Sequence, residues 1–261
     1  MNNQAAENQA LWRQLSASFS FRYADRSLGN FPAEWAPRTT TELLADGGSL
    51  ERISGSDPQT GLRVTQTIRR FVDSPALDWV MEFENGGDTD APILEAVSPL
   101  DVTLPIQKNE RLRLHHANGS DCRKDDFLPL LSELPPNGRK MLCPAGGRSS
   151  DVGFPFMNLQ YPGGGLVIAI GWTGQWAANF ERSADSIRIS AGMERIHLRL
   201  HPGEKIRTPR ILLLPWQGDD MEVGQNLLRQ LLLAHYLPRI NGELVLPPTA
   251  QCLQAYFYLT G

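Results

Sequence analysis

GLRVTQTIRRFVDSPALDWVMEFENGGD, residues 61–88, contains two runs in which apolar and polar side chains alternate. Leu62 and Val64 share one face of the first run, and every second residue from Leu77 to Phe83 is apolar in the second. The turn-forming Gly86-Gly87-Asp88 ends the stretch. A period of two is typical of strands that bury one face. We therefore expect these residues to form strands of an antiparallel sheet.

Similar alternating runs continue through most of the chain and are separated by glycine, proline and aspartate. With 23 glycines and 19 prolines in 261 residues, the sequence is rich in turn formers. Residues 187–191 and 196–200 are expected to form an adjacent pair of strands joined at Gly192-Met193. The other runs span residues 93–97, 111–115, 166–172, 186–191, 195–200 and 206–214.

Helical signals are confined to the two ends of the chain. Residues 5–15 could form a short helix, and 219–237 gives the better case. There an acidic pair, Asp219-Asp220, precedes leucines at helical spacing, and Pro238 ends the run. A (β/α)₈ barrel needs eight helices that each follow a strand, which this pattern excludes. The predicted fold is mainly β: a large antiparallel β-sandwich with one C-terminal helix.

The composition excludes several classes of function. The net charge of −4 gives no support for nucleic-acid binding, and no apolar run is long enough to cross a membrane. The N-terminus has no secretion signal, and three widely spaced cysteines form neither a disulfide framework nor a metal site. We therefore expect a cytoplasmic protein with reduced thiols and with no nucleic-acid or membrane partner.

No self-contained catalytic motif is present in the sequence. Dinucleotide, phosphate-loop, nucleophile-elbow and HExxH patterns are missing, so we expect no cofactor and no metal. Residues 117–160 break the strand pattern except for a short strand at 139–142, and such long irregular segments are often functional. Within this segment, Asp125-Asp126 either faces a ligand or forms part of a solvated loop. Asp219-Asp220 is interpreted as a helix cap.

The segment Gly171-Trp172-Thr173-Gly174-Gln175-Trp176 is the most distinctive local feature. If it is a strand, Trp172 and Trp176 lie on the same face and are separated by small residues that allow close approach. Indole faces and fixed polar groups are suited to a sugar, whereas burial in the core is the alternative for both tryptophans.

Several motifs together resemble the N-terminal β-supersandwich domain of the α-galactosidases of glycoside hydrolase family 36. They are Pro144 to Ser150, Phe154 to Leu159, Ala169 to Trp176, and Leu200 to Glu204 followed by Thr208-Pro209. The resemblance covers about residues 15–245, and its motifs are specific as a set. It implies that residues 1–245 form the supersandwich, and that 246–261 are a linker and the possible start of a catalytic barrel that is absent here.

The resemblance also implies a role. Members of the family cleave α-galactosides with two aspartates on the barrel, and neither aspartate has a matching position in this chain, so no catalytic residue is assigned. We expect a non-catalytic domain that packs on the barrel and lends loops to the rim of the sugar pocket. The alternatives are a self-standing carbohydrate-binding sandwich and an enzyme with its own site in residues 118–160.

The resemblance places residues 118–127 at the sugar-pocket rim, and the 148–150 turn follows them. The expected partners are a galactoside or related carbohydrate, the missing barrel and a second copy of the chain. An apolar docking face is expected around residues 238–261, which include Tyr256-Phe257-Tyr258-Leu259. The candidate rim residues are Asp125, Asp126, Phe127, Arg148, Trp172 and Trp176.

Overall fold

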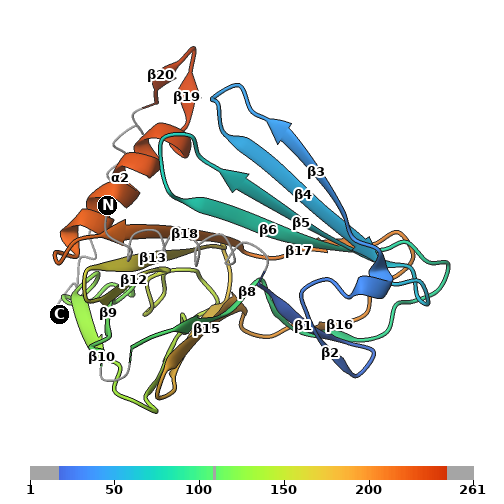
Figure 1. The fold of residues 1–261 in the computed structure, drawn as a ribbon, viewed down its shortest axis with the longest axis horizontal. Coiled ribbons are helices and arrows are strands. Elements are labelled where there is room, and N and C mark those ends of the chain that lie inside the picture. The colour runs from blue at the N-terminus through green and yellow to red at the C-terminus, as the bar shows by residue number, and fades with distance from the viewer. Residues whose placement is uncertain (1–17, 108–109, 246–261) are drawn as a thin grey trace, which may run out of the picture.

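The structure, a computed structural model, describes residues 18–107 and 110–245 as two layers of antiparallel strands (Figure 1). The upper layer is a sheet of ten strands in the order β10-β9-β12-β13-β18-β6-β5-β4-β3, with β17 also paired to β6. Its strands are β3 Arg38–Leu43, β4 Ser49–Ser56, β5 Leu62–Arg70, β6 Leu77–Asn85, β9 Arg113–Ala117, β10 Pro129–Glu133, β12 Phe156–Tyr161, β13 Gly164–Gly171, β17 Lys205–Arg207 and β18 Arg210–Gln217.

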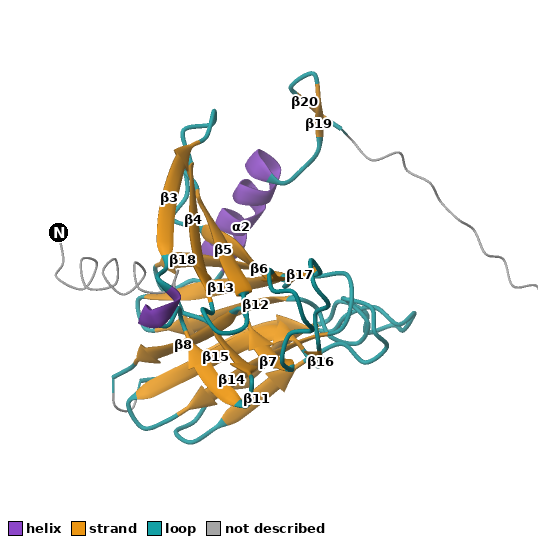
Figure 2. Cartoon of the chain, turned by 90° about the vertical axis from the view of Figure 1, so that its right-hand side faces the viewer, coloured by secondary structure: helices purple, strands orange, loops and turns teal. Residues whose placement is uncertain are grey.

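The lower layer consists of two four-stranded sheets, in the orders β16-β7-β1-β2 and β11-β14-β15-β8. A short 3₁₀ helix spans Ala33–Trp35, and the hairpin β19–β20 follows the C-terminal helix α2. Figure 2 shows this helix and hairpin standing apart from the lower layer. The remaining bounds are β1 Ser20–Tyr23, β2 Arg26–Gly29, β7 Leu94–Ser98, β8 Leu100–Pro105, β11 Arg139–Leu142, β14 Trp176–Arg182, β15 Ser186–Met193, β16 His197–Leu198, β19 Arg239–Ile240, β20 Glu243–Leu244 and α2 Glu222–His235.

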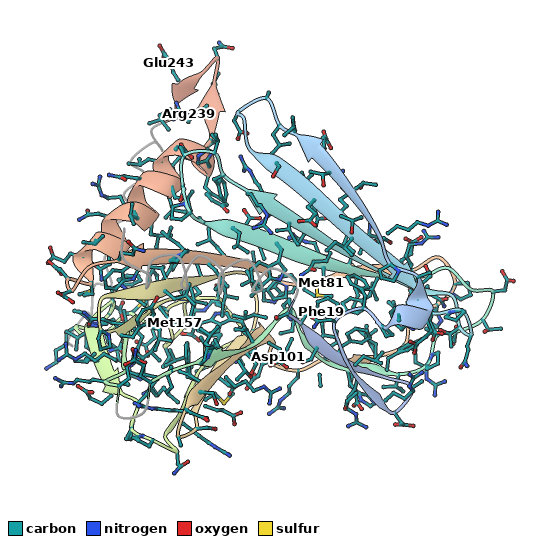
Figure 3. All side chains as sticks on the ribbon, in the orientation of Figure 1. Phe19, Met81, Asp101, Met157, Arg239 and Glu243 are labelled. Carbon is teal, nitrogen blue, oxygen red and sulfur yellow. The ribbon has the colours of Figure 1, made fainter. Side chains whose placement is uncertain are left out.

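The main core lies between the two layers and contains the apolar faces predicted from residues 61–88. Phe83 of β6 meets Phe21 of β1 edge-to-face, with ring centroids 5.2 Å apart. Trp79 is completely buried and donates its indole N–H to the carbonyl oxygen of Pro99 at 2.8 Å. A buried indole needs such a partner, because an unpaired N–H in the core is costly. Burial of these side chains holds the layers together (Figure 3).

Helix α2 covers the outer face of the ten-stranded sheet, over β13 and β18. Leu231 and Trp216 are buried in this second, smaller core. The N-cap residue is Met221, which makes no side-chain cap, and the Asp220 carboxylate just before it accepts the backbone N–H of Glu222 at 2.9 Å. The helix was predicted correctly, and it is shorter than the expected 219–237 at both ends.

Two predictions about strands are wrong. Residues 187–191 and 196–200 do not pair with each other: β15 lies between β14 and β8, while β16 pairs with β7. The run 206–214 is divided at Thr208-Pro209, because Pro209 has no N–H to continue a ladder. Thr208 is buried there and accepts the backbone N–H of Met81 through its hydroxyl at 3.0 Å.

The segment 117–160 is more regular than expected. It contains β10 and the beginning of β12 in addition to the predicted strand at 139–142. Strand β12 was missed although Asn158 and Gln160 alternate with Met157 and Leu159, because this short run lies between Pro155 and Pro162 in a segment rich in turn formers. In the part of the chain that the structure describes, no helix has the length and apolar character needed to span a bilayer. The expected docking residues 246–261 lie outside the described residues.

The packing of α2 predicts the effect of a methyl group at Gly224. A Cβ on Gly224 would lie 2.5 Å from Cδ1 of Trp216. On helix propensity alone, Gly224→Ala would stabilise the helix by about 0.5–1 kcal/mol. Because of the overlap we expect the opposite, a loss of about 1–3 kcal/mol in the free energy of unfolding measured in urea. Val223→Ala, on the same helix at an exposed position, serves as the control.

Candidate functional site

Two loops at one end of the sandwich are tied to each other by backbone hydrogen bonds. Residues 118–128 connect β9 to β10, and 143–155 connect β11 to β12. The backbone N–H of Gly119 bonds the Val152 carbonyl at 2.7 Å, and that of Ser120 bonds the Ser150 carbonyl at 2.6 Å. A Cβ on Gly119 would lie 2.0 Å from the Ser150 oxygen, so only glycine permits this approach. We call this pair of segments the loop end.

Asp126 holds the first loop in shape. Its carboxylate accepts the Ser120 hydroxyl at 2.6 Å and the backbone N–H groups of Asp121 and Arg123, both at 3.1 Å. The Ser120 hydrogen bond, aided by those from the backbone, lowers the pKa of this carboxyl below its usual range. Since its oxygens are already occupied, Asp126 stabilises the loop rather than presenting a free carboxylate to a ligand.

Asp125 and Phe127 are the residues of this loop that remain available. The Asp125 side chain is exposed, and its closest described donor is the Asn118 amide at 3.4 Å. Phe127 is 54% exposed and has a positive φ of 58°. Its ring meets Phe154 edge-to-face at 5.6 Å, and Phe154 lies 5.1 Å from Phe156. Phe127 is thus fixed by a row of phenylalanines while one face stays accessible.

Arg148 lies in the second loop and is bonded within it. Its guanidinium donates to the carboxylate of Asp151 at 2.9 Å, and most of the side chain is exposed to solvent. Asp151 is buried, and its carboxylate fills the space beside Gly146, where a Cβ would lie 1.8 Å from the nearer oxygen. Arg148 therefore fixes the turn, and its exposed surface leaves it within reach of a ligand.

Trp172 and Trp176 do not share a strand. Strand β13 ends at Gly171 and β14 begins at Trp176, so a turn separates the two indoles. Trp176 is completely buried and donates its indole N–H to the Ser149 carbonyl at 2.7 Å, which supports the second loop from below. A side chain with no exposed surface cannot stack on a sugar, so the structure removes Trp176 from the candidate rim. Trp172 is half-buried.

Gln175, in the turn between these tryptophans, was missed as a site-building residue. Its amide oxygen accepts the backbone N–H of Gly147 at 2.9 Å, and its amide nitrogen donates to the Pro144 carbonyl. The turn thereby joins the loop end. A polar residue in a Gly-rich turn was the available signal, but its partners are distant in sequence.

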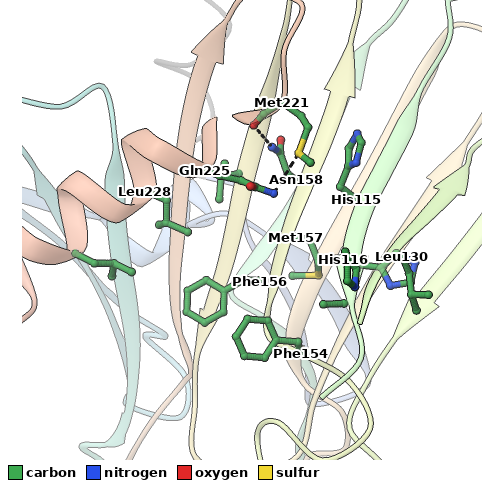
Figure 4. Close-up of a pocket in the computed structure, with 14 residues that line it drawn as sticks. His115, His116, Leu130, Phe154, Phe156, Met157, Asn158, Met221, Gln225 and Leu228 are labelled. Atoms are coloured by element: carbon green, nitrogen blue, oxygen red, sulfur yellow. Dashed lines mark hydrogen bonds between the residues drawn. The ribbon is translucent and has the colours of Figure 1, made fainter. Parts of the chain in front are cut away.

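An apolar groove that was not predicted from the sequence runs beside α2 (Figure 4). It encloses about 360 Å³ and is bordered on one side by a stripe of the helix, Met221, Gln225, Leu228 and Leu232. The other lining residues come from β9, β10, β12, β13 and the second loop, and the lining contains no aspartate, glutamate, lysine or arginine. We call this the α2 groove, and its other lining residues are His115, His116, Ala117, Pro129, Leu130, Phe154, Phe156, Met157, Asn158 and Val167.

The polar groups of the α2 groove are already bonded. His115 contacts the Gln160 amide oxygen through Nε2 at 2.9 Å, and His116 contacts the Ser132 hydroxyl at 2.9 Å. Burial, together with nearby Lys140 and His115, lowers the pKa of His116, which keeps the ring neutral. Among the described residues, no group of three His, Cys, Asp or Glu side chains is placed to hold a metal ion.

Comparison with known proteins shows the fold. No family model and no curated protein matches the chain. An α-galactosidase from Lactobacillus brevis matches with a TM-score of 0.62 and 19% identity, over 83% of this chain and 30% of that chain. The α-galactosidase AgaA from Geobacillus stearothermophilus, of glycoside hydrolase family 36, matches with a TM-score of 0.57 and 18% identity, over 77% and 30% of the two chains. A variant of AgaA in complex with raffinose gives a TM-score of 0.55.

The galactosidase domain of the α-galactosidase-sucrose kinase AgaSK also matches, with a TM-score of 0.55 and 12% identity. The chain thus spans about 30% of the length of the first α-galactosidases it matches. The predicted supersandwich fold is therefore confirmed as a fold shared with part of these enzymes.

The bonds of Asp126 predict that its removal loosens the first loop. We expect Asp126→Ala to increase the rate of tryptic cleavage at Arg123 and Lys124 several-fold, because three hydrogen bonds that hold this loop are lost. Asp125→Ala, at the neighbouring exposed position, should leave the rate nearly unchanged. Equal rates for Asp126→Ala and the unaltered chain would contradict the assignment.

The same bonds predict a pH dependence. The folded-state pKa of Asp126 is lowered, so its contribution to loop stability is present above the unfolded pKa of about 4 and is lost as the pH falls through the lower folded value. The resistance of this loop to proteolytic cleavage in the unaltered chain, measured with a protease that is active in acid, should therefore persist down to pH 4 and decline below it.

Proposed function

We propose that this chain is a non-catalytic domain of an α-galactosidase-like glycoside hydrolase. The observation that carries the proposal is the coverage of the structural match: most of this chain, but only 30% of the α-galactosidases, is aligned. The role of the matched part is carried to this chain by analogy of fold alone. On this proposal, residues 1–245 form the supersandwich and 246–261 lead toward the catalytic barrel.

The loop end supports a role at the rim of a sugar pocket. Asp125 offers an exposed acceptor for hydroxyl groups, and Phe127 offers an accessible ring face. Both are held on loops whose shape is fixed by Asp126 and by the hydrogen bonds between the two loops. Arg148 and Trp172 complete the proposed rim, and Trp176 acts beneath it. The expected ligand is a galactoside or a related carbohydrate, which agrees with the raffinose complex of AgaA.

The α2 groove supports a role in packing against the catalytic domain. Its lining is uncharged and continues, through Phe154, to the exposed Phe127 of the loop end. Leu131 of the edge strand β10 adds to this surface: it lies opposite the groove residue His115 and is 53% exposed. Apolar surface gathered beside a groove is typical of a contact with another protein domain. Because about 30% of the matched α-galactosidases is covered, a further domain is a candidate partner, and the catalytic barrel is our proposal for it.

The described cysteines agree with a cytoplasmic location, which we include in the proposal. Cys122 is exposed and Cys143 is half-buried, and neither forms a disulfide. Unpaired thiols of this kind are usual in reducing compartments.

The proposal predicts that this chain alone does not hydrolyse α-galactosides. A retaining glycosidase needs two carboxyl groups about 5 Å apart, one of which has a raised pKa. In the loop end, Asp126 has a lowered pKa and occupied oxygens, so it cannot act as the acid beside Asp125. Incubation with an aryl α-galactoside should release no phenol above background. Turnover that Asp125→Asn abolishes would show instead that the loop end is itself an active site.

We expect the isolated chain to self-associate, because the apolar surface of the α2 groove is left exposed when no catalytic domain covers it. Leu131→Glu should weaken this association, as measured by light scattering over a concentration series. Leu43→Glu is the matched control: Leu43 is an exposed leucine on β3, the opposite edge strand of the same sheet. A monomer at every concentration, or equal effects of both substitutions, would count against a packing face beside α2.

A further inference from the structure

A second cavity, of about 480 Å³, lies where β16 of the lower layer approaches β17 of the upper layer. Its volume is within the range of small-molecule sites, about 300–1,000 Å³. Trp172 borders it from the turn after β13, and Met193 together with residues 195–198 and 206–207 forms the remainder. We call it the arginine cavity, after Arg195 and Arg207.

The floor of the arginine cavity is apolar. Ile196, Leu198 and Ile206 line it, and all three are half-buried and pack against the main core. These side chains are therefore held in place by the sandwich itself. A ligand with an apolar face could rest on them without any rearrangement of the layers.

Arg195 and Arg207 have no partner for their guanidinium groups among the described residues. This is unusual in this chain, where most described arginines pair with a carboxylate or a carbonyl oxygen, as Arg188 does with Asp101 at 2.7 Å. Three further described arginines lack a side-chain partner: Arg38, Arg199 and Arg229. Arg195 and Arg207 are both exposed to solvent and both line this cavity, so their guanidinium groups supply several unused donors for an oxyanion.

Two nearby carboxylates, those of Glu82 and Glu95, are engaged with other groups. Glu82 lies opposite Arg207 in the ladder between β6 and β17, yet its carboxylate pairs with Lys205 at 2.9 Å. Glu95 accepts from His197 at 2.8 Å and from Arg22 at 3.2 Å. The positive charge of the two arginines is consequently not neutralised by these neighbours.

Trp172 and His197 add features that suit a ring with hydroxyl groups. The indole of Trp172 is half-buried at the border of the cavity and provides a stacking surface. If Nδ1 of His197 carries the proton donated to Glu95, the neutral ring presents Nε2 as an acceptor. An acceptor, a stacking surface and two cationic donors thus border one apolar floor.

We propose that the arginine cavity binds a saccharide that carries an oxyanion, such as a carboxylate, sulfate or phosphate group. The anionic group contacts Arg195 and Arg207, and the sugar ring rests between Trp172 and the apolar floor. This inference does not depend on the proposed role in an α-galactosidase, because it concerns binding to this chain alone.

The probes are D-galacturonate and D-galactose, which differ in the carboxylate that replaces the hydroxymethyl group. Binding to the full chain is measured by the fluorescence of Trp172. The other described tryptophans are buried, and Trp12→Phe removes the one outside the described residues. We expect galacturonate to bind about tenfold more tightly than galactose, and to bind more weakly as ionic strength rises.

Arg195→Gln and Arg207→Gln should each weaken galacturonate binding about tenfold, as measured by calorimetry. Arg38→Gln and Arg229→Gln are matched controls, since these arginines also lack side-chain partners but lie elsewhere, on β3 and on α2. They should leave the affinity unchanged. Trp172→Phe should abolish the fluorescence change.

Three results would overturn the proposal. Equal affinity for galactose would show that the charge is not recognised, and inorganic sulfate binding as tightly as galacturonate would show that the ring is not recognised. Equal weakening by the control substitutions would show that only the general charge of the surface matters. Evidence that the chain is not part of an α-galactosidase would, by contrast, leave the binding of galacturonate unaffected. Each proposal can therefore fail without the other.

Discussion

Burial of both faces of strand β13 is the constraint on which the rest of the structure depends. Seven of its residues, from Gly164 to Ile170, are buried. Leu166, Ile168 and Ile170 face the core between the layers, while Val167 and Ala169 face α2. Because both faces are apolar, the sheet needs a second layer below and the helix above. The Gly165 position is fixed by the same packing, since a Cβ there would lie 2.4 Å from the Trp216 ring.

Much of the fold was predictable from the sequence, because strands with one polar face show a period of two. Residues 61–88 predicted the correct strands for this reason, and the leucines before Pro238 predicted the helix through their helical spacing. Strand β12 was not predicted, because its short alternating run lies between Pro155 and Pro162 in a segment rich in turn formers. The pairing of β15 with β8, across about 85 residues, is set by packing that no local pattern reports.

The candidate site was predictable only in its location. The break in alternation at residues 117–160 indicated the two loops at this end of the sandwich but not strands β10 and β12 beside them, and exposed Asp125 and Phe127 lie in the first loop. The roles of Asp126 and Trp176 depend on which groups they bond, and Ser120 and Ser149 are not identifiable as partners from composition. The arginine cavity was missed for a related reason: scattered arginines become informative only when the partners of each are known.

The loop end lies between the α2 groove and the arginine cavity, the two surfaces for which we propose a binding partner. The row Phe127, Phe154 and Phe156 leads to the α2 groove, while the turn that carries Trp172 leads to the arginine cavity. The loops themselves are bonded internally, through Asp126, Gln175 and Trp176, so their shape does not require a partner. Preformed loops cost little ordering entropy when a ligand or domain binds. The two unsatisfied surfaces differ in kind, one uncharged and one cationic. A barrel domain that covers the groove beside α2 would therefore cover the apolar surface, and the exposed arginines of the arginine cavity would still be available to an anion.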